Sequence, residues 1–142
     1  MGKILTAKTI VAGAAEGKAL VSKQALSFWG GVSPKTGEII DRRHELSGQF
    51  VTGRIFVFPH GKGSSTASAV LLETVRAGLG PAAIINIKLD AILALGSIIA
   101  EQLYERAVPI VLLPEESFFS IKQDDTVRIE PDGSVIVNPT QS

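Results

Sequence analysis

The stretch Phe58-Pro59-His60-Gly61-Lys62-Gly63-Ser64-Ser65-Thr66 decides the fold, because it joins an apolar strand to an apolar helix. Residues 53–58 end in four consecutive apolar side chains typical of a buried strand, and residues 67–79 read as a helix. A strand that passes through glycines into a Ser/Thr-rich helix start brings backbone N–H groups to the positive end of the helix dipole. We therefore predict that this stretch is an active-site loop, able to bind an anion or to stabilise a serine alkoxide.

Length and composition predict one domain, residues 1–142, with enough chain for a substantial core. Apolar residues make up 45% of the chain and the mean hydropathy is +0.29. The longest strongly apolar stretch, residues 91–100, is too short to cross a membrane, so no membrane partner is expected. The apolar surplus indicates either a partner protein or a large core.

Charge and cysteine content exclude several classes of function. Lys plus Arg and Asp plus Glu both number 14, which gives no basic surface for nucleic acid. The absence of cysteine excludes disulfides, thiol catalysis and thiolate metal ligands. Two histidines, His44 and His60, are too few for a zinc site without carboxylates. The chain shows no secretory signal pattern, so we expect a cytoplasmic location.

The order of apolar and glycine-rich segments predicts an α/β fold. The expected elements are strands at 3–10, 17–21, 51–58, 82–87 and 108–113, helices at 64–79 and 91–104, a helical turn at 114–119 and a hairpin of 126–129 with 134–137. Asp90 is the expected N-cap of the second helix, and a glycine-bounded turn at 12–17 predicts a β-hairpin or a β-corner. Near-continuous apolar strands alternating with helices indicate a parallel sheet covered by helices. With hairpins at both ends, the prediction is a mixed, barrel-like sheet with flanking helices.

Residues 26–48 contain too many glycines and prolines for a regular element, yet too many apolar side chains for disorder. We expect an ordered loop, and loops of this length inside compact domains are usually functional. Trp29 within it is either a core anchor or an interface residue. His44 is either a surface or capping histidine or a catalytic one.

The central loop admits several chemistries. It is not a Walker motif, because the lysine lies between the glycines, and a serine hydrolase is weakly supported without a Gly-x-Ser-x-Gly elbow. Ser64 is then either a plain N-cap or a serine base that removes a proton next to a carboxylate, as in dehydratases. The glycines at positions 61 and 63 are expected to let the backbone turn sharply and approach a ligand.

Three stretches together resemble the small subunit of the aconitase X family. They are residues 27–37 (SFWGGVSPKTG), 40–48 (IDRRHELSG) and 58–64 (FPHGKGS). The last is also similar to the Gly-x-Gly-Ser-Ser loop in the swivel domain of aconitase and isopropylmalate isomerase. The arginine that follows the serines in those enzymes is replaced here by Thr66-Ala67.

The resemblance implies a swivelling β/β/α domain and a two-subunit hydro-lyase. The large subunit would carry the iron–sulfur cluster, and this chain would bind no metal or cofactor of its own. The chain would supply Ser64 as the general base, and a small-molecule substrate would bind in the heterodimer or a higher assembly. The implied active-site loops hold Gly61, Lys62, Gly63, Ser65, His44, Gly30 and Gly31.

Two substrates are compatible with the resemblance, cis-3-hydroxy-L-proline and (R)-5-phosphomevalonate. Residues 86–90 (NIKLD) depart from the stretch expected of the archaeal phosphomevalonate enzymes, which favours the hydroxyproline enzyme. Functions of another class are a phosphohistidine-type carrier, whose usual Thr-Ser-His run is missing, and a non-catalytic binding domain.

Overall fold

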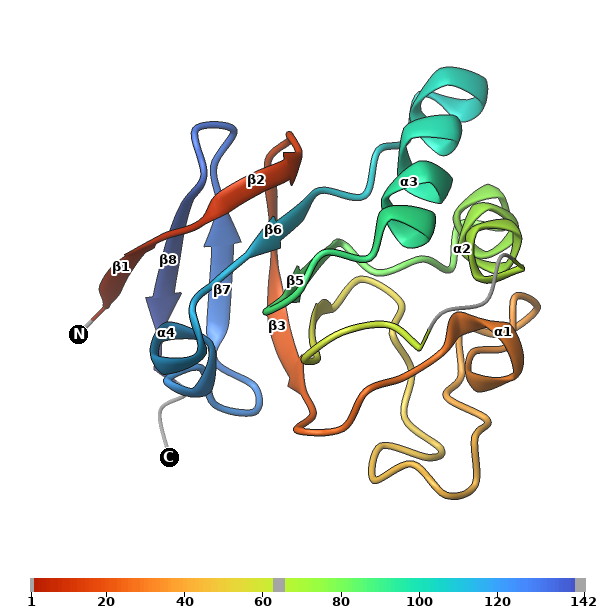
Figure 1. Ribbon diagram of the computed structural model, residues 1–142, viewed down its shortest axis with the longest axis horizontal. Coiled ribbons are helices and arrows are strands. Elements are labelled where there is room, and N and C mark those ends of the chain that lie inside the picture. Colours follow the sequence, from red (N-terminus) through yellow and green to blue (C-terminus); the bar gives the residue numbers. More distant parts are fainter. Residues whose placement is uncertain (1, 63–65, 140–142) are drawn as a thin grey trace.

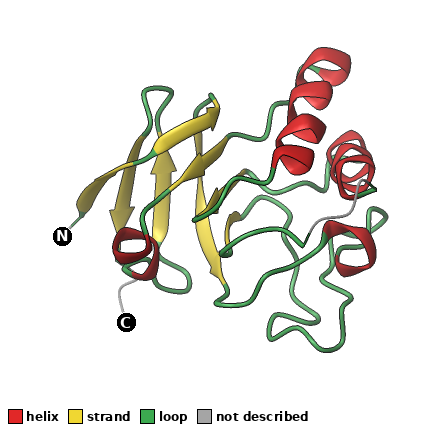
Figure 2. Cartoon of the chain, viewed as in Figure 1, coloured by secondary structure: helices red, strands yellow, loops and turns green. Residues whose placement is uncertain are grey.

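The computed structural model describes residues 2–62 and 66–139. Figures 1 and 2 show a curved sheet with two longer helices on one side of it. The elements are β1 (Lys3–Thr6), β2 (Lys8–Val11), β3 (Ala15–Val21), α1 (Phe28–Gly31), β4 (Ile55–Val57), α2 (Ala67–Arg76), β5 (Ala83–Asn86), α3 (Ala91–Tyr104), β6 (Ile110–Leu112), α4 (Glu115–Phe119), β7 (Thr126–Ile129) and β8 (Ser134–Asn138).

The eight strands form one sheet in the order β1-β8-β7-β3-β4-β5-β6-β2. The two edge strands are consecutive in the chain, because only Ala7 separates β1 from β2. β1 pairs antiparallel with β8, and β2 pairs antiparallel with β6. One bent segment thus covers both edges of the sheet and nearly closes it, which confirms the predicted mixed, barrel-like architecture.

The N-terminal strands differ from the prediction in two ways. The expected strand at 3–10 is interrupted at Ala7, whose N–H donates to the Gly133 carbonyl at 2.9 Å. Of the two alternatives for the turn at 12–17, the β-hairpin is wrong, because β3 pairs with β7 and β4 instead of with β2. A glycine turn specifies only the local chain direction. Ala19 and Leu20 become fully buried in the middle of the sheet, which a two-stranded hairpin could not achieve.

β3, β4, β5 and β6 are parallel neighbours, as the apolar runs predicted. Alternate residues of β4 enter two separate cores. Phe56 joins the core beneath α2 and α3, while Ile55 and Val57 join the core inside the barrel. The strand itself is shorter than the predicted 51–58, because a turn with Gly53 at φ +69° precedes it.

The helices largely follow the prediction. α3 has the predicted bounds, and the Asp90 side chain accepts hydrogen bonds from the N–H groups of Ile92 and Leu93. α2 ends at Arg76 rather than 79, because Gly78 adopts φ +78° and stops the helix. α4 and the β7–β8 hairpin are confirmed. Within the described residues, we find no helix with the length and apolar character needed to cross a membrane.

The long segment between β3 and β4 is ordered, as predicted, and α1 is the only helix in it. Phe28, Val32 and Ile39 are buried in the core beneath the helices, and the Phe28 ring lies 6.2 Å from that of Phe56. Trp29 is not a core anchor, because 58% of its surface is exposed. Of the two alternatives for Trp29, only an interface role remains open.

Candidate functional site

The first half of the glycine loop is held from both sides as it leaves β4. On the β5 side, the Phe58 N–H donates to Ile85 O at 3.1 Å and the Ile87 N–H donates to Pro59 O at 2.8 Å. On the β3 side, the Lys62 N–H donates to Leu26 O at 3.2 Å. The path of the chain is therefore fixed as far as Lys62. Gly63, Ser64 and Ser65 lie outside the described residues, so the predicted base stays a prediction.

Asn86, the last residue of β5, also holds this loop, and sequence reasoning missed it. Its Nδ2 donates to the Phe58 carbonyl at 2.7 Å, at the point where Pro59 interrupts the strand. The side chain is completely buried, and its Oδ1 has no hydrogen-bond partner within the described ranges. The sequence did contain a signal, because Asn86 is an amide residue at the end of an apolar strand. That strand lies next to the one that precedes the glycine loop, and α/β proteins build their sites at this edge of the sheet.

Gly61 makes a close contact that the sequence did not predict. It is not among the described glycines with a positive φ, so it makes no unusual turn. Instead, a Cβ built on Gly61 would overlap Oδ2 of Asp90, the carboxylate that caps α3. The missing side chain thus allows the glycine loop and the start of α3 to pack against each other.

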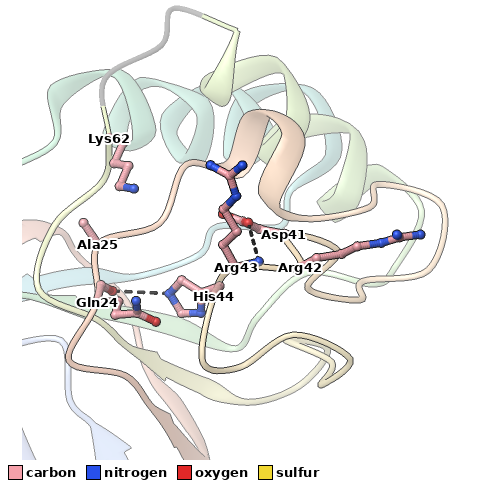
Figure 3. A pocket seen from close by; sticks show the side chains of 7 residues that line it. All are labelled: Gln24, Ala25, Asp41, Arg42, Arg43, His44 and Lys62. Atoms are coloured by element: carbon pink, nitrogen blue, oxygen red, sulfur yellow. Dashed lines mark hydrogen bonds between the residues drawn. The ribbon is translucent and has the colours of Figure 1, made fainter.

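A hollow of about 680 Å³ lies beside Lys62 and the loop at 41–44. Figure 3 shows Lys62 and Arg43 on opposite sides of this hollow. The lining residues are Gln24, Ala25, Asp41, Arg42, Arg43, His44 and Lys62. Two cations that converge from different segments can bind a carboxylate or a phosphate.

His44 lies in the wall of this hollow and is 6% exposed, so it is not the surface histidine that the sequence allowed. Its Nδ1 accepts a hydrogen bond from the Leu46 N–H at 3.1 Å. Because a backbone N–H can only donate, the proton of the neutral ring is on Nε2, which lies 3.5 Å from Gln24 O. Both ring nitrogens are thus engaged in fixing the loop against the chain that follows β3.

Glu45 also connects the loop at 41–44 to the chain that follows β3. Its Oε1 accepts from the Ser22 hydroxyl at 2.6 Å and from the Lys23 N–H at 2.7 Å. These hydrogen bonds, that of Ser22 first, lower the pKa of the Glu45 carboxyl below its ordinary value. The exposed carboxylate therefore stabilises the loop that carries Arg43 and His44.

The other predicted site residues lie outside the hollow. Gly30 adopts φ +76° and Gly31 packs against Leu26, but neither lines the hollow. His60 has its Nδ1 2.9 Å from Gly61 O and lines a separate, smaller hollow with Lys23 and Lys88. The structure therefore brings Lys62 and His44 together, with Arg43 as an addition that the sequence did not predict. The described residues contain no group of three or more His, Cys, Asp or Glu placed to hold a metal ion.

Comparison with known proteins identifies the relatives of this chain. A family model described as the aconitase X swivel domain matches residues 4–137. A cis-3-hydroxy-L-proline dehydratase of Pseudomonas aeruginosa is 49% identical over 79% of this chain, which spans only 19% of that protein's length. A phosphomevalonate dehydratase small subunit of Methanosarcina acetivorans is 40% identical, over 88% of this chain and 83% of that one.

A solved structure agrees with these sequence matches. Aconitase X of Thermococcus kodakaraensis, in its holo-form, superimposes with a TM-score of 0.86 at 36% identity. The match covers 96% of this chain and 99% of that chain. The likeness therefore extends over nearly the entire fold.

Replacing Gly61 with alanine should destabilise the protein by about 1–2 kcal/mol, because the new methyl group displaces the Asp90 cap. The measurement is the free energy of unfolding in denaturant. Asp90→Ala is the matched variant, and the double variant should lose less than the sum of the two, since the clash needs Asp90. An additive pair would contradict the proposed packing.

Replacing Glu45 with glutamine should make the stability of the protein fall less steeply as the pH is lowered into the acid range. The folded-state pKa of Glu45 lies below its unfolded value, so its contribution is present above that unfolded value and disappears as pH falls through the folded pKa. Thermal melts between about pH 5 and pH 3 should show a shallower decline for Glu45→Gln than for the wild type. Ser22→Ala removes the first hydrogen bond and should flatten the same decline, whereas unchanged slopes would refute this explanation.

Proposed function

We propose, because the chain belongs to the aconitase X swivel-domain family, that it is the small catalytic part of a two-subunit dehydratase. One observation carries this proposal within the fold itself. The loop that leads to Ser64 is fixed by backbone hydrogen bonds and by the Asn86 side chain. It lies beside a hollow that is lined by cationic side chains, among them Lys62 and Arg43. Rigid support of a loop next to a charged hollow is what a positioned base needs.

Dehydration of a hydroxy acid requires removal of a proton next to a carboxylate and departure of the hydroxyl group. Ser64 is proposed as the base that takes the proton. A serine hydroxyl is too weak an acid to ionise unaided, so its alkoxide needs nearby positive charge. Lys62, two residues before it, and the N-terminal end of α2 would supply that charge.

The iron–sulfur cluster expected of this family does not fit this chain. The chain contains no cysteine, so it has no thiolate to ligate such a cluster. A large subunit would hold the cluster, and the residues of this chain would act on the substrate's proton and anionic groups.

The proposed substrate is cis-3-hydroxy-L-proline. The higher identity to the bacterial hydroxyproline enzyme supports this choice. The hollow also has a suitable charge pattern, because Arg43 and Lys62 could bind a carboxylate while Asp41 could face an ammonium group. An amino acid carries both charges.

Phosphomevalonate is the second candidate, because archaeal phosphomevalonate dehydratase small subunits are also 39–40% identical to this chain. This chain and the archaeal small subunit match over most of both lengths, whereas the hydroxyproline enzyme is about five times longer than the matched segment. Assay of both substrates with the reconstituted complex would distinguish the two candidates.

Replacing Ser64 with alanine should lower turnover by roughly 10²–10⁴-fold while the fold survives, because a general base contributes that much. The assay uses the chain reconstituted with its large subunit, and the chain alone should show no turnover. Ser65→Ala is the neighbouring control. If Ser64 were only a helix cap, its loss would cost about 1 kcal/mol of stability and leave turnover within about threefold of wild type.

Replacing Trp29 with alanine should weaken association with the large subunit and leave the isolated chain's melting temperature nearly unchanged. The indole is mostly exposed, so its removal costs the isolated fold little. Exposed tryptophans in glycine-bounded loops often anchor interfaces. Titration of the large subunit with wild-type and variant chains measures the effect, and equal dissociation constants would exclude Trp29 from the interface.

A further inference from the structure

Arg43 has a guanidinium group that no described residue neutralises. The ion pairs between described residues involve Arg54, Arg76 and Arg128. Asp41, two residues earlier, directs its Oδ1 to the Arg43 backbone N–H at 3.0 Å rather than forming an ion pair with the side chain. Arg43 thus presents free donors at the hollow, opposite Lys62 (Figure 3).

The backbone beneath Arg43 is anchored on both sides. Before it, the Asp41 side chain closes a tight turn onto the Arg43 N–H. After it, His44 is buried, and the Glu45 N–H donates to Gln24 Oε1 at 2.7 Å. A side chain that starts from a fixed backbone loses less entropy when it binds a ligand.

We propose that Arg43 binds the carboxylate of the substrate, with Lys62 as a second positive charge beside it. The inference rests on the proposed function, because both candidate substrates of the dehydratase carry a carboxylate. A guanidinium offers two parallel N–H donors that match the two carboxylate oxygens, which a lysine cannot do. Arg43 is thus a binding residue, and its effect should appear in KM more than in kcat.

Lys35 provides a control outside the hollow. It lies in the same long segment and is exposed as Arg43 is, but it is not among the residues that line the hollow. Lys35→Gln and Arg43→Gln change the net charge equally, so an effect of overall charge appears in both. Only a direct contact with the substrate separates the two variants.

The test is steady-state kinetics of the reconstituted complex with whichever candidate substrate the wild type converts. Arg43→Gln should raise KM at least about tenfold and leave kcat within about threefold, as loss of a charged hydrogen-bond pair predicts. Arg43→Lys should recover part of the loss, and Lys35→Gln should match the wild type. Equal KM values for the two glutamine variants would overturn the proposal, as would a loss confined to kcat.

A second measurement separates this inference from the proposed function. If the wild-type complex converts neither substrate, the proposed function fails, and acetate titration of the full chain by NMR still tests Arg43. Acetate should shift the amide signals of Arg43 and Lys62 in the wild type and in Lys35→Gln, but not in Arg43→Gln. Shifts that persist in Arg43→Gln, or none in the wild type, would show that Arg43 does not bind carboxylates.

Discussion

The hydrogen bond from the Asn86 side chain to the Phe58 carbonyl controls how the central strand ends. Pro59 has no N–H to donate to a neighbouring strand, although its carbonyl still accepts from the Ile87 N–H, so the strand begins to leave the sheet there. The Asn86 amide satisfies the carbonyl that this departure would leave unpaired in a buried position. The glycine loop, the contact between Gly61 and Asp90, and the placement of Lys62 all follow from this exit.

Arg43 and Lys62 come from segments that meet because the sheet is parallel at this edge. Residues 22–26 follow β3 and residues 58–62 follow β4, and parallel neighbours bring these connections to the same side. The long segment after α1 then returns to this edge, where the hydrogen bonds of His44 and Glu45 attach it to Ser22 and Gln24. Arg43 reaches the hollow through this attachment.

The sequence predicted what depends on local patterns and missed what depends on distant partners. The period of apolar residues and the Asp90 cap located α3 at its observed bounds, and the apolar runs located the parallel strands. The pairing of β2 with β6 was not predictable from a glycine turn, because nothing local distinguishes one strand partner from another. Among the site residues, Lys62 was predicted from the loop. Arg43 and Asn86 were missed, because their importance comes from neighbours about 20 to 30 positions away in the chain.

The open character of the hollow is consistent with a site that a second protein completes. Exposed charges act through water, where the attraction between a cation and a carboxylate at about 4 Å is near 1 kcal/mol. The same pair in a water-poor site interacts several times more strongly. Arg43 and Lys62 are both exposed in the isolated chain, while the mostly exposed Trp29 lies in the same long segment as Arg43. A partner that covers this segment would exclude water from the hollow and strengthen the cations' attraction for an anionic substrate at the place where the proposed reaction needs it.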